Sequence, residues 1–174
     1  MKKTTWLILI IAALVIVVDQ TGKYLVTTAL PLGGAWSPLP GLNPFIQIVH
    51  TYNTGVAFGL FKDIGVIFII VPLLISGAIL FYARRLRPDQ TLTAVALGLV
   101  LGGALGNVVD RIRLGGGVID FFDIGIGTLR NASNFADWSI VAGVILLAAA
   151  MLLEDRRSRQ KETVSTTGTD HPAQ

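Results

Sequence analysis

The chain has 174 residues, of which 52% are hydrophobic and only 14% are charged, whereas about a quarter of an ordinary soluble domain is charged. This composition argues against a water-soluble fold and favours a membrane protein. With no cysteine and only two histidines, the chain has no disulfide framework and too few ligands for a zinc site. The net charge of +3 is spread over short basic clusters between apolar stretches, so we expect no nucleic-acid partner.

The first predicted element is a membrane-spanning helix at about residues 5–26. Lys2 and Lys3 precede it, as in a cleavable export signal, but no small-residue cleavage site follows its apolar stretch, so we expect a retained helix. Asp19 and Lys23 are four residues apart and share one helix face, where they can pair. Because an intramembrane charge is costly unless it is paired, this pair is either a functional site or a structural salt bridge. The sequence leaves both alternatives open.

The segment that follows, at about residues 30–62, is long for a connection between two spans and contains several prolines and glycines. Residues 46–49 are β-branched or alternate in polarity, which is typical of a short strand. A turn-like segment from Thr51 to Gly55 comes next. We expect this connection to form a small β-rich platform outside the membrane.

Three more spanning helices are predicted, at about residues 64–83, 90–110 and 137–154. Each of the first two contains an uncharged run of 20 residues. As a helix, such a run is about 30 Å long and matches the hydrocarbon thickness of a bilayer. The last contains a shorter uncharged run of 16 residues, which polar residues at the water boundary can extend. The predicted fold class is therefore an all-α membrane protein with four transmembrane helices and the β-rich platform.

The predicted helix at about residues 90–110 carries glycines at intervals of four residues, Gly98, Gly102 and Gly106. Small residues at this spacing let a second helix approach closely, so we interpret them as a packing surface. Near the outer end of the same helix, Asn107 and Arg111 share one face. We expect these polar side chains to line a wet pocket where the helix leaves the bilayer.

The second outer connection, at about residues 112–136, contains Asp120 and ends just before Asp137, which begins the fourth helix. After that helix, residues 156–174 are polar and are expected to form a disordered tail. Residues 1–155 are then the single membrane domain. The basic residues favour cytoplasmic termini, because nine of them fall on the side of the termini and four on the other side.

The candidate chemistry follows from the side chains present. A metal site lacks ligands, and neither Ser133 nor Ser139 lies in a nucleophile motif. Two carboxylates, Asp120 and Asp137, remain, and two carboxylates held close together share a proton and can act as base and acid on a peptide bond. From the residues alone, Asp137 can equally be a helix cap and Asp120 a solvated loop acid.

Five ordered motifs resemble those of lipoprotein signal peptidase, or signal peptidase II. The resemblance covers all four predicted spans and both outer connections. The motifs are Asp19-x-x-x-Lys23, Asn53-Thr54-Gly55-Val56-Ala57-Phe58, Gly106-Asn107-Val108-Val109-Asp110-Arg111, Val118-Ile119-Asp120-Phe121 and Asn134-Phe135-Ala136-Asp137. This resemblance implies a bacterial inner-membrane aspartyl endopeptidase that cuts the signal peptide of prolipoproteins before a cysteine carrying diacylglycerol.

The resemblance also implies roles for individual residues. Asp120 and Asp137 match the catalytic pair. The residues matching substrate-binding or pocket positions are Asp19, Lys23, Asn53, Gly55, Asn107, Arg111 and Asn134. We expect no metal or cofactor, a monomer in contact with membrane lipid, and an active site near the outer face. We also expect the first connection to cover the site, and Phe121 and Phe122 to meet lipid or the signal helix.

Two functions from other classes remain as alternatives. One is a small ion-coupled transporter or channel with a relay of Asp19, Lys23, Asp110 and Arg111. These residues gather toward one membrane boundary, which disfavours a path across the bilayer. The other is a noncatalytic assembly partner that uses the glycine face of the third helix.

Overall fold

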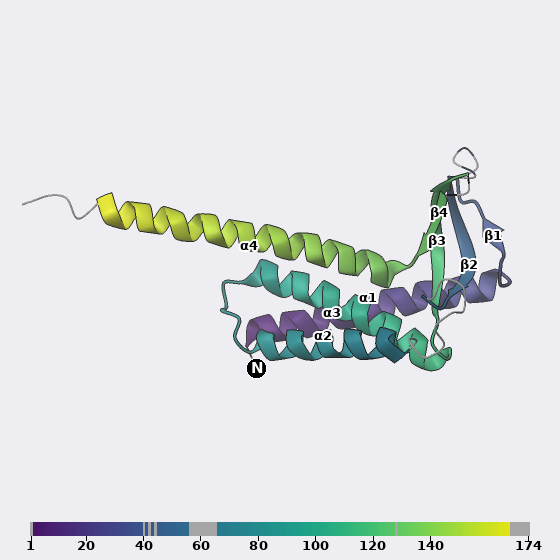
Figure 1. Cartoon of the computed structure of the whole chain (residues 1–174), viewed down its shortest axis with the longest axis horizontal. Helices are drawn as coiled ribbons and strands as arrows, with labels where there is room; N and C mark the ends of the chain where they lie inside the picture. The colour runs from purple at the N-terminus through teal and green to yellow at the C-terminus, as the bar shows by residue number, and fades with distance from the viewer. Residues whose placement is uncertain are drawn as a thin grey trace, which may run out of the picture.

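A computed structural model describes residues 2–39, 41, 43, 45–55, 66–127 and 129–167. Its helices and strands are, in order along the chain, α1 (Lys3–Ala29), β1 (Ala35–Trp36), β2 (Ile46–Asn53), α2 (Ile67–Ala83), α3 (Thr91–Arg113), β3 (Val118–Ile126), β4 (Leu129–Ser133) and α4 (Phe135–Thr167). The helices lie alongside one another and the sheet stands at one end of them, far from the N-terminus (Figure 1). The predicted class of four helices with a small β platform is confirmed.

Within the described residues, three helices are long and apolar enough to cross a membrane, namely α1, α3 and the Phe135–Arg156 part of α4. The remaining helix, α2, is apolar but has only 17 residues. Pro72 lies inside α2, and the Ser76 hydroxyl donates a hydrogen bond of 2.7 Å to the Pro72 carbonyl oxygen. The predicted second span began at residue 64, and residues 56–65 lie outside the described part of the chain.

The helix α3 packs against all three other helices, and its glycines explain how. A Cβ atom added to Gly98 would lie 2.8 Å from the Ile11 Cβ atom of α1, and one added to Gly102 would lie 2.6 Å from the Val15 Cβ atom. Gly103 faces Ala136 and Ser139 of α4. The glycine spacing therefore serves helix packing, because it brings α1 and α4 close to the α3 backbone.

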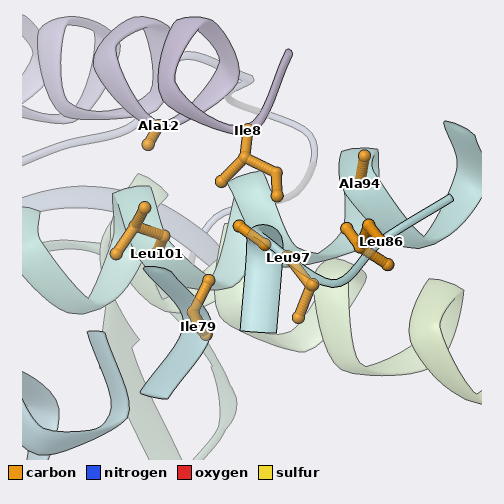
Figure 2. Packing of buried hydrophobic residues seen from close by; sticks show 8 residues of the cluster. Ile8, Ala12, Ile79, Leu86, Ala94, Leu97 and Leu101 are labelled. Atoms are coloured by element: carbon orange, nitrogen blue, oxygen red, sulfur yellow. The ribbon is translucent and has the colours of Figure 1, made fainter. Parts of the chain in front are cut away.

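The hydrophobic core lies toward the end of the bundle opposite the sheet. Its residues come from α1, α2, α3 and the turn between α2 and α3. Figure 2 shows them converging: Ile8 and Ala12, Ile79, Leu86, and Ala94, Leu97 and Leu101. In contrast, the sheet ends of α1 and α3 bury four polar or charged residues, Asp19, Lys23, Asn107 and Asp110, which lie at the candidate site.

The sheet has four antiparallel strands in the order β1-β2-β3-β4. Two of them, β1 and β2, come from the expected platform segment, and β3 and β4 come from the second connection, for which no strand was predicted. The residues of β3 are rich in Val, Ile and Phe, which are strand-forming. A register shift between Ile48 and Thr51 of β2 places Asn53 opposite Val118, diagonal to Asp120.

Two expectations differ from the structure. Helix α4 continues to Thr167, through residues 156–167 that were expected to be disordered, because this segment is rich in helix-forming Arg, Gln, Lys and Glu and contains no glycine or proline. Phe121 was expected to meet lipid or the signal helix, but it is only 3% exposed. It packs instead against Phe122 and Phe135, with ring centroids 4.6 and 5.4 Å away.

We predict that Gly102→Ala destabilises the fold by about 1–3 kcal/mol, because the new methyl group would meet backbone atoms of Ala12 and push α1 away from α3. Thermal unfolding in detergent, followed by tryptophan fluorescence, measures the change. The matched control is Gly77→Ala in α2, where nothing lies within 4 Å of the added carbon. An alanine there favours the helix, so equal losses for both variants would contradict the packing role of Gly102.

Candidate active site

The two candidate catalytic acids lie in one groove at the sheet end of the bundle. Asp120 is the third residue of β3 and Asp137 is in the first turn of α4. Because β4 pairs with β3 and leads directly into α4, the hairpin returns the chain to the neighbourhood of Asp120. Both acids, together with Asn53, line a groove of about 700 Å³. The fold thus brings together two carboxylates that are distant in the sequence.

Asp120 is held by an asparagine on each oxygen. The Nδ2 group of Asn53 donates to Oδ2 at 2.8 Å, and that of Asn134 donates to Oδ1 at 2.7 Å. The residue is only 2% exposed, so it is no solvated loop acid. Asn53 reaches it from the neighbouring strand because diagonal positions of paired strands lie close together. This arrangement fixes the orientation of the carboxyl group.

Asp137 is positioned from a different side. Its Oδ1 atom accepts a hydrogen bond of 2.7 Å from Asn107 Nδ2, whereas its backbone N–H donates to Asn134 Oδ1 at 2.9 Å. Asn134 therefore caps α4, in the way expected of an N-cap side chain, and Asp137 does not. The Asp137 carboxyl group is left to face the groove.

Asn134 contacts both acids, since its amide nitrogen binds the Asp120 side chain and its amide oxygen binds the Asp137 backbone. It is completely buried. One side chain thus couples the end of the hairpin to the start of α4 and sets the relative placement of the two aspartates.

Burial raises the pKa of the Asp120 carboxyl group above its usual value. The hydrogen bond from Asn53 acts in the opposite direction, and the negative charge of Asp137 raises the pKa further. This is the electrostatic situation of two acids in which one retains a proton. The groove can therefore hold one protonated and one ionised carboxyl group.

Behind this site, three charged side chains form a buried cluster. The Lys23 ammonium group lies 2.6 Å from Asp19 Oδ2 and 2.8 Å from Asp110 Oδ2, and it also donates to Asn107 Oδ1 at 3.1 Å. These side chains are at most 3% exposed. Asn107 in turn donates to Asp137, so Lys23 sets which way the Asn107 amide faces.

The same cluster reaches the start of α4 directly. Asp19 Oδ1 accepts a hydrogen bond of 2.9 Å from the Ala136 backbone nitrogen. Within the described part of the chain, neither Asp19 nor Lys23 lines the groove. The Asp19–Lys23 salt bridge therefore has a structural role. It affects the groove indirectly, through the hydrogen bonds to the Asn107 side chain and the Ala136 backbone.

Two other expected site residues lie around the acids. Gly55 has a left-handed φ of 70°, and its N–H donates to Asn53 Oδ1 at 2.8 Å, so the turn that needs glycine also holds Asn53. Arg111 is half-buried, and its guanidinium carbon lies 5.6 Å from the centre of the Phe68 ring. One of its nitrogens is 3.4 Å from the Asn107 carbonyl oxygen.

Sequence reasoning missed several residues of the site. Gln20 donates to Asp110 Oδ1 at 2.8 Å and closes the charged cluster from the side of α1. Ser133 and Trp138 line the groove, and the Trp138 indole N–H donates to the Ser133 hydroxyl at 2.8 Å. Asp110 lies three residues after Asn107 and therefore on the same helix face, so this spacing could have predicted that Asp110 belongs to the cluster. The positions of Ser133 and Trp138 follow only from the hairpin.

We predict that Lys23→Met destabilises the protein by about 3–5 kcal/mol, because Asp19 and Asp110 would remain buried without their counter-charge. The measurement is the thermal unfolding midpoint in detergent. As a control, Arg87→Met removes an exposed ion pair with Asp89 and is expected to cost at most about 1 kcal/mol. A Lys23 variant as stable as the Arg87 variant would refute a structural role of the cluster.

Among the described residues, no group of three histidine, cysteine, aspartate or glutamate side chains is arranged to hold a metal ion. The polar side chains of the groove are carboxylates, amides and a hydroxyl. Their chemistry is that of general acid–base catalysis at a site sheltered by the sheet.

Comparisons with known proteins agree with this chemistry. Residues 11–153 match the Peptidase_A8 family, described as Signal peptidase (SPase) II. The chain is 39% identical over 145 residues to a lipoprotein signal peptidase of Moorella thermoacetica, covering 83% of this chain and 92% of that protein. It is 40% identical over 164 residues to a lipoprotein signal peptidase of Syntrophus aciditrophicus, covering 90% of this chain and 98% of that protein.

Two solved structures, each titled as a bacterial membrane enzyme determined by the in meso method, have a similar fold. One has a TM-score of 0.74 and 33% identity, covering 83% of this chain and 92% of its own. The other has a TM-score of 0.72 and 28% identity, covering 96% and 94%. The chain therefore belongs to the lipoprotein signal peptidase family, the bacterial membrane aspartyl peptidases that cleave the signal peptides of prolipoproteins.

Proposed function

We propose that Asp120 and Asp137 are the catalytic dyad of this peptidase and that they cut the prolipoprotein on the amino side of a cysteine carrying diacylglycerol. The observation that carries the proposal is that both carboxyl groups line one groove, each in contact with an asparagine side chain. Such contacts hold a catalytic acid and base in a fixed relative orientation.

The dyad acts on a water molecule. The ionised carboxylate removes a proton from the water as its oxygen attacks the scissile carbonyl carbon. The protonated carboxyl group donates its proton to the leaving amine as the carbon–nitrogen bond breaks. Because burial raises the pKa of Asp120, we assign the retained proton to Asp120 and the basic role to Asp137.

The other expected site residues act on the dyad or on the substrate backbone. Asn53, Asn107 and Asn134 orient the two acids, and Gly55 holds the turn that presents Asn53. We assign Arg111 to the substrate backbone, because its guanidinium group lies near the acids and its Nε atom has no partner within the described part of the chain.

We further propose that residues 1–155 form a monomeric peptidase domain with both termini in the cytoplasm and the groove near the outer face of the inner membrane. Support comes from the excess of basic residues on the side of the termini and from the sheet at the opposite end of the helices (Figure 1). A substrate anchored in the bilayer by its acyl chains then meets the dyad at the membrane boundary, without a nucleic-acid or cofactor partner.

The transport and assembly alternatives receive no support from a specific observation. Three of the four residues proposed for an ion relay, Asp19, Lys23 and Asp110, form a closed cluster of paired charges. The glycine face proposed for an assembly partner is covered by α1 and α4 of the same chain.

We predict that Asp120→Asn and Asp137→Asn each lower the cleavage rate of a diacylglyceryl prolipoprotein peptide by on the order of 100-fold to 10,000-fold, since each removes one proton-transfer group. Cleavage in detergent is followed by the mass of the released signal peptide. Asp123→Asn is the matched control, because Asp123 is a buried acid of the same strand that pairs with Arg130 outside the groove. Full activity of either dyad variant would exclude the mechanism.

Removal of Asn53 tests the assigned protonation. In Asn53→Ala, the carboxylate of Asp120 loses a donor that stabilises its charged form, so the pKa of Asp120 rises further. The protonated form then persists to higher pH, and we expect the alkaline limb of the pH profile of kcat/KM to move upward while the maximal rate falls.

The control for this variant is Asn43→Ala, at an exposed position where the Asn43 side chain contacts Gln47. Its pH profile should match that of the unaltered protein. An alkaline limb that stays in place in Asn53→Ala, or moves downward, would argue against Asp120 as the proton-carrying acid.

A further inference from the structure

A second hollow lies between the end of α1 and the sheet edge formed by β1. It shares no lining residue with the groove of the two aspartates. Its volume is about 440 Å³. Its walls, which define the α1–β1 pocket, come from one helix and two strands: Leu25, Val26, Ala29 and Leu30 of α1, Trp36 of β1 and Ile48 of β2.

The way in which β1 and β2 attach to the end of α1 creates this pocket. Trp36 pairs with Ile48 across the two strands, so both side chains point to the same face of the sheet. The His50 Nδ1 atom lies 2.9 Å from the Leu30 carbonyl oxygen, and the Gly33 N–H donates to the His50 carbonyl oxygen at 2.8 Å. These bonds fasten β2 to the chain just after α1. They leave the space between the helix face and the two strands open.

The lining of the pocket decides what kind of ligand it suits. All six side chains are apolar, so a charged or polar ligand finds no side chain with which to pair. Apolar cavities do not hold ordered water but do take apolar molecules. The volume is within the range of about 300–1,000 Å³ that small-molecule sites occupy. The α1–β1 pocket therefore suits a hydrocarbon ligand.

The pocket lies where α1 leaves the bilayer. The helix is long and apolar enough to cross a membrane. About 20 residues cross the hydrocarbon layer, which places Leu25 near the boundary opposite the N-terminus. Around the opening, Leu25, Leu32 and Trp36 are 58%, 68% and 58% exposed. Neighbouring apolar side chains seldom face water, and tryptophan is typical of the membrane interface. The pocket thus opens toward lipid.

We propose that the α1–β1 pocket binds one acyl chain of a bilayer phospholipid, whose glycerol and headgroup stay at the membrane surface. Lipid is the apolar molecule that surrounds α1 at this depth. Its high local concentration favours its binding by mass action over that of a second copy of the chain. The site is separate from the groove and makes no demand on the reaction that occurs there.

A filled pocket acts on the fold through β2. Ile48 contacts the bound chain, and Asn53, farther along the same strand, donates its hydrogen bond to Asp120. The acyl chain therefore holds β2 against α1 and supports the strand that presents Asn53. A ligand that binds only the folded protein also raises its stability, so the unfolding midpoint should depend on lipid.

The test uses the fluorescence of Trp36 in a protein that carries Trp6→Phe and Trp138→Phe, which leaves Trp36 as its only tryptophan. Phosphatidylglycerol with brominated acyl chains is added to this protein in detergent, because bromine quenches an indole ring that it contacts. We expect quenching to saturate near an equimolar amount of lipid.

The matched control for this titration is Trp6, which is 54% exposed at the other end of α1. It is the only tryptophan in a protein that carries Trp36→Phe and Trp138→Phe. Its quenching should rise gradually, because it meets only the lipid that surrounds any membrane helix. A gradual curve for Trp36 that resembles the curve for Trp6 would overturn the inference.

Ala29→Phe then fills the pocket, and Ala13→Phe is its control at an exposed position of α1 outside the pocket. In the unaltered protein, phosphatidylglycerol at about 100 times its Kd should raise the thermal unfolding midpoint by about 5–10 °C. We expect Ala13→Phe to keep this shift and the saturable quenching of Trp36, and Ala29→Phe to lose both. Glycerol phosphate, which has no acyl chain, should shift neither signal.

Three further outcomes would overturn the inference. They are saturable quenching that persists in Ala29→Phe, stabilisation by glycerol phosphate alone, and an unquenched Trp36 in a protein that light scattering shows to be a dimer, which would assign this face to a second copy. If Ala29→Phe fails to fold, the smaller Ala29→Leu replaces it, with the same expected loss. None of these measurements depends on cleavage, so the lipid site and the dyad can fail independently.

Discussion

A lysine ammonium group buried between two aspartates organises the sheet end of this molecule. Lys23 belongs to α1 and Asp110 to α3, and the second aspartate, Asp19, binds the backbone of α4 at Ala136. Buried charges of this kind are tolerated only when they are paired and hydrogen-bonded. The pairing requirement therefore fixes three helices relative to one another at the level of the candidate active site.

The two proposed catalytic acids, Asp120 and Asp137, receive their geometry from this cluster and from the sheet. Asn107 accepts a hydrogen bond from Lys23 and donates one to Asp137, so the orientation of its amide group is set by the buried cation. Asp120 is set by Asn53 from β2 and by Asn134 at the start of α4. Asparagine suits these positions because its amide group offers a donor and an acceptor and carries no charge of its own. Burial and the negative charge of Asp137 raise the pKa of Asp120, and the hydrogen bonds from Asn53 and Asn134 lower it.

The placement of the dyad also suits a substrate that lives in the membrane. The groove joins polar groups contributed by the sheet to an apolar face of α4 that continues into a membrane span. The two acids and an apolar face of α4 are thus adjacent in one groove. The stacked pair of Phe122 and Trp138 lies at the junction, where an amphipathic indole ring is well suited to a boundary between water and lipid.

The sequence by itself determined the membrane character, the approximate helix positions and the glycine packing face of α3, and it supplied the residues proposed for the site, because these depend on composition, on local periodicity and on ordered motifs. It also predicted that Asp19 and Lys23 can pair, since residues four apart share a helix face.

The tertiary structure decided the rest. It showed that Asn134 caps α4 in place of Asp137, that Asp120 is buried in a strand, and that the second connection completes the sheet. It also showed that Lys23 reaches Asp110 and Asn107 on another helix. These features depend on contacts between residues far apart in the chain, and such contacts are specified by how whole helices and strands pack, a constraint that no local pattern of residues contains.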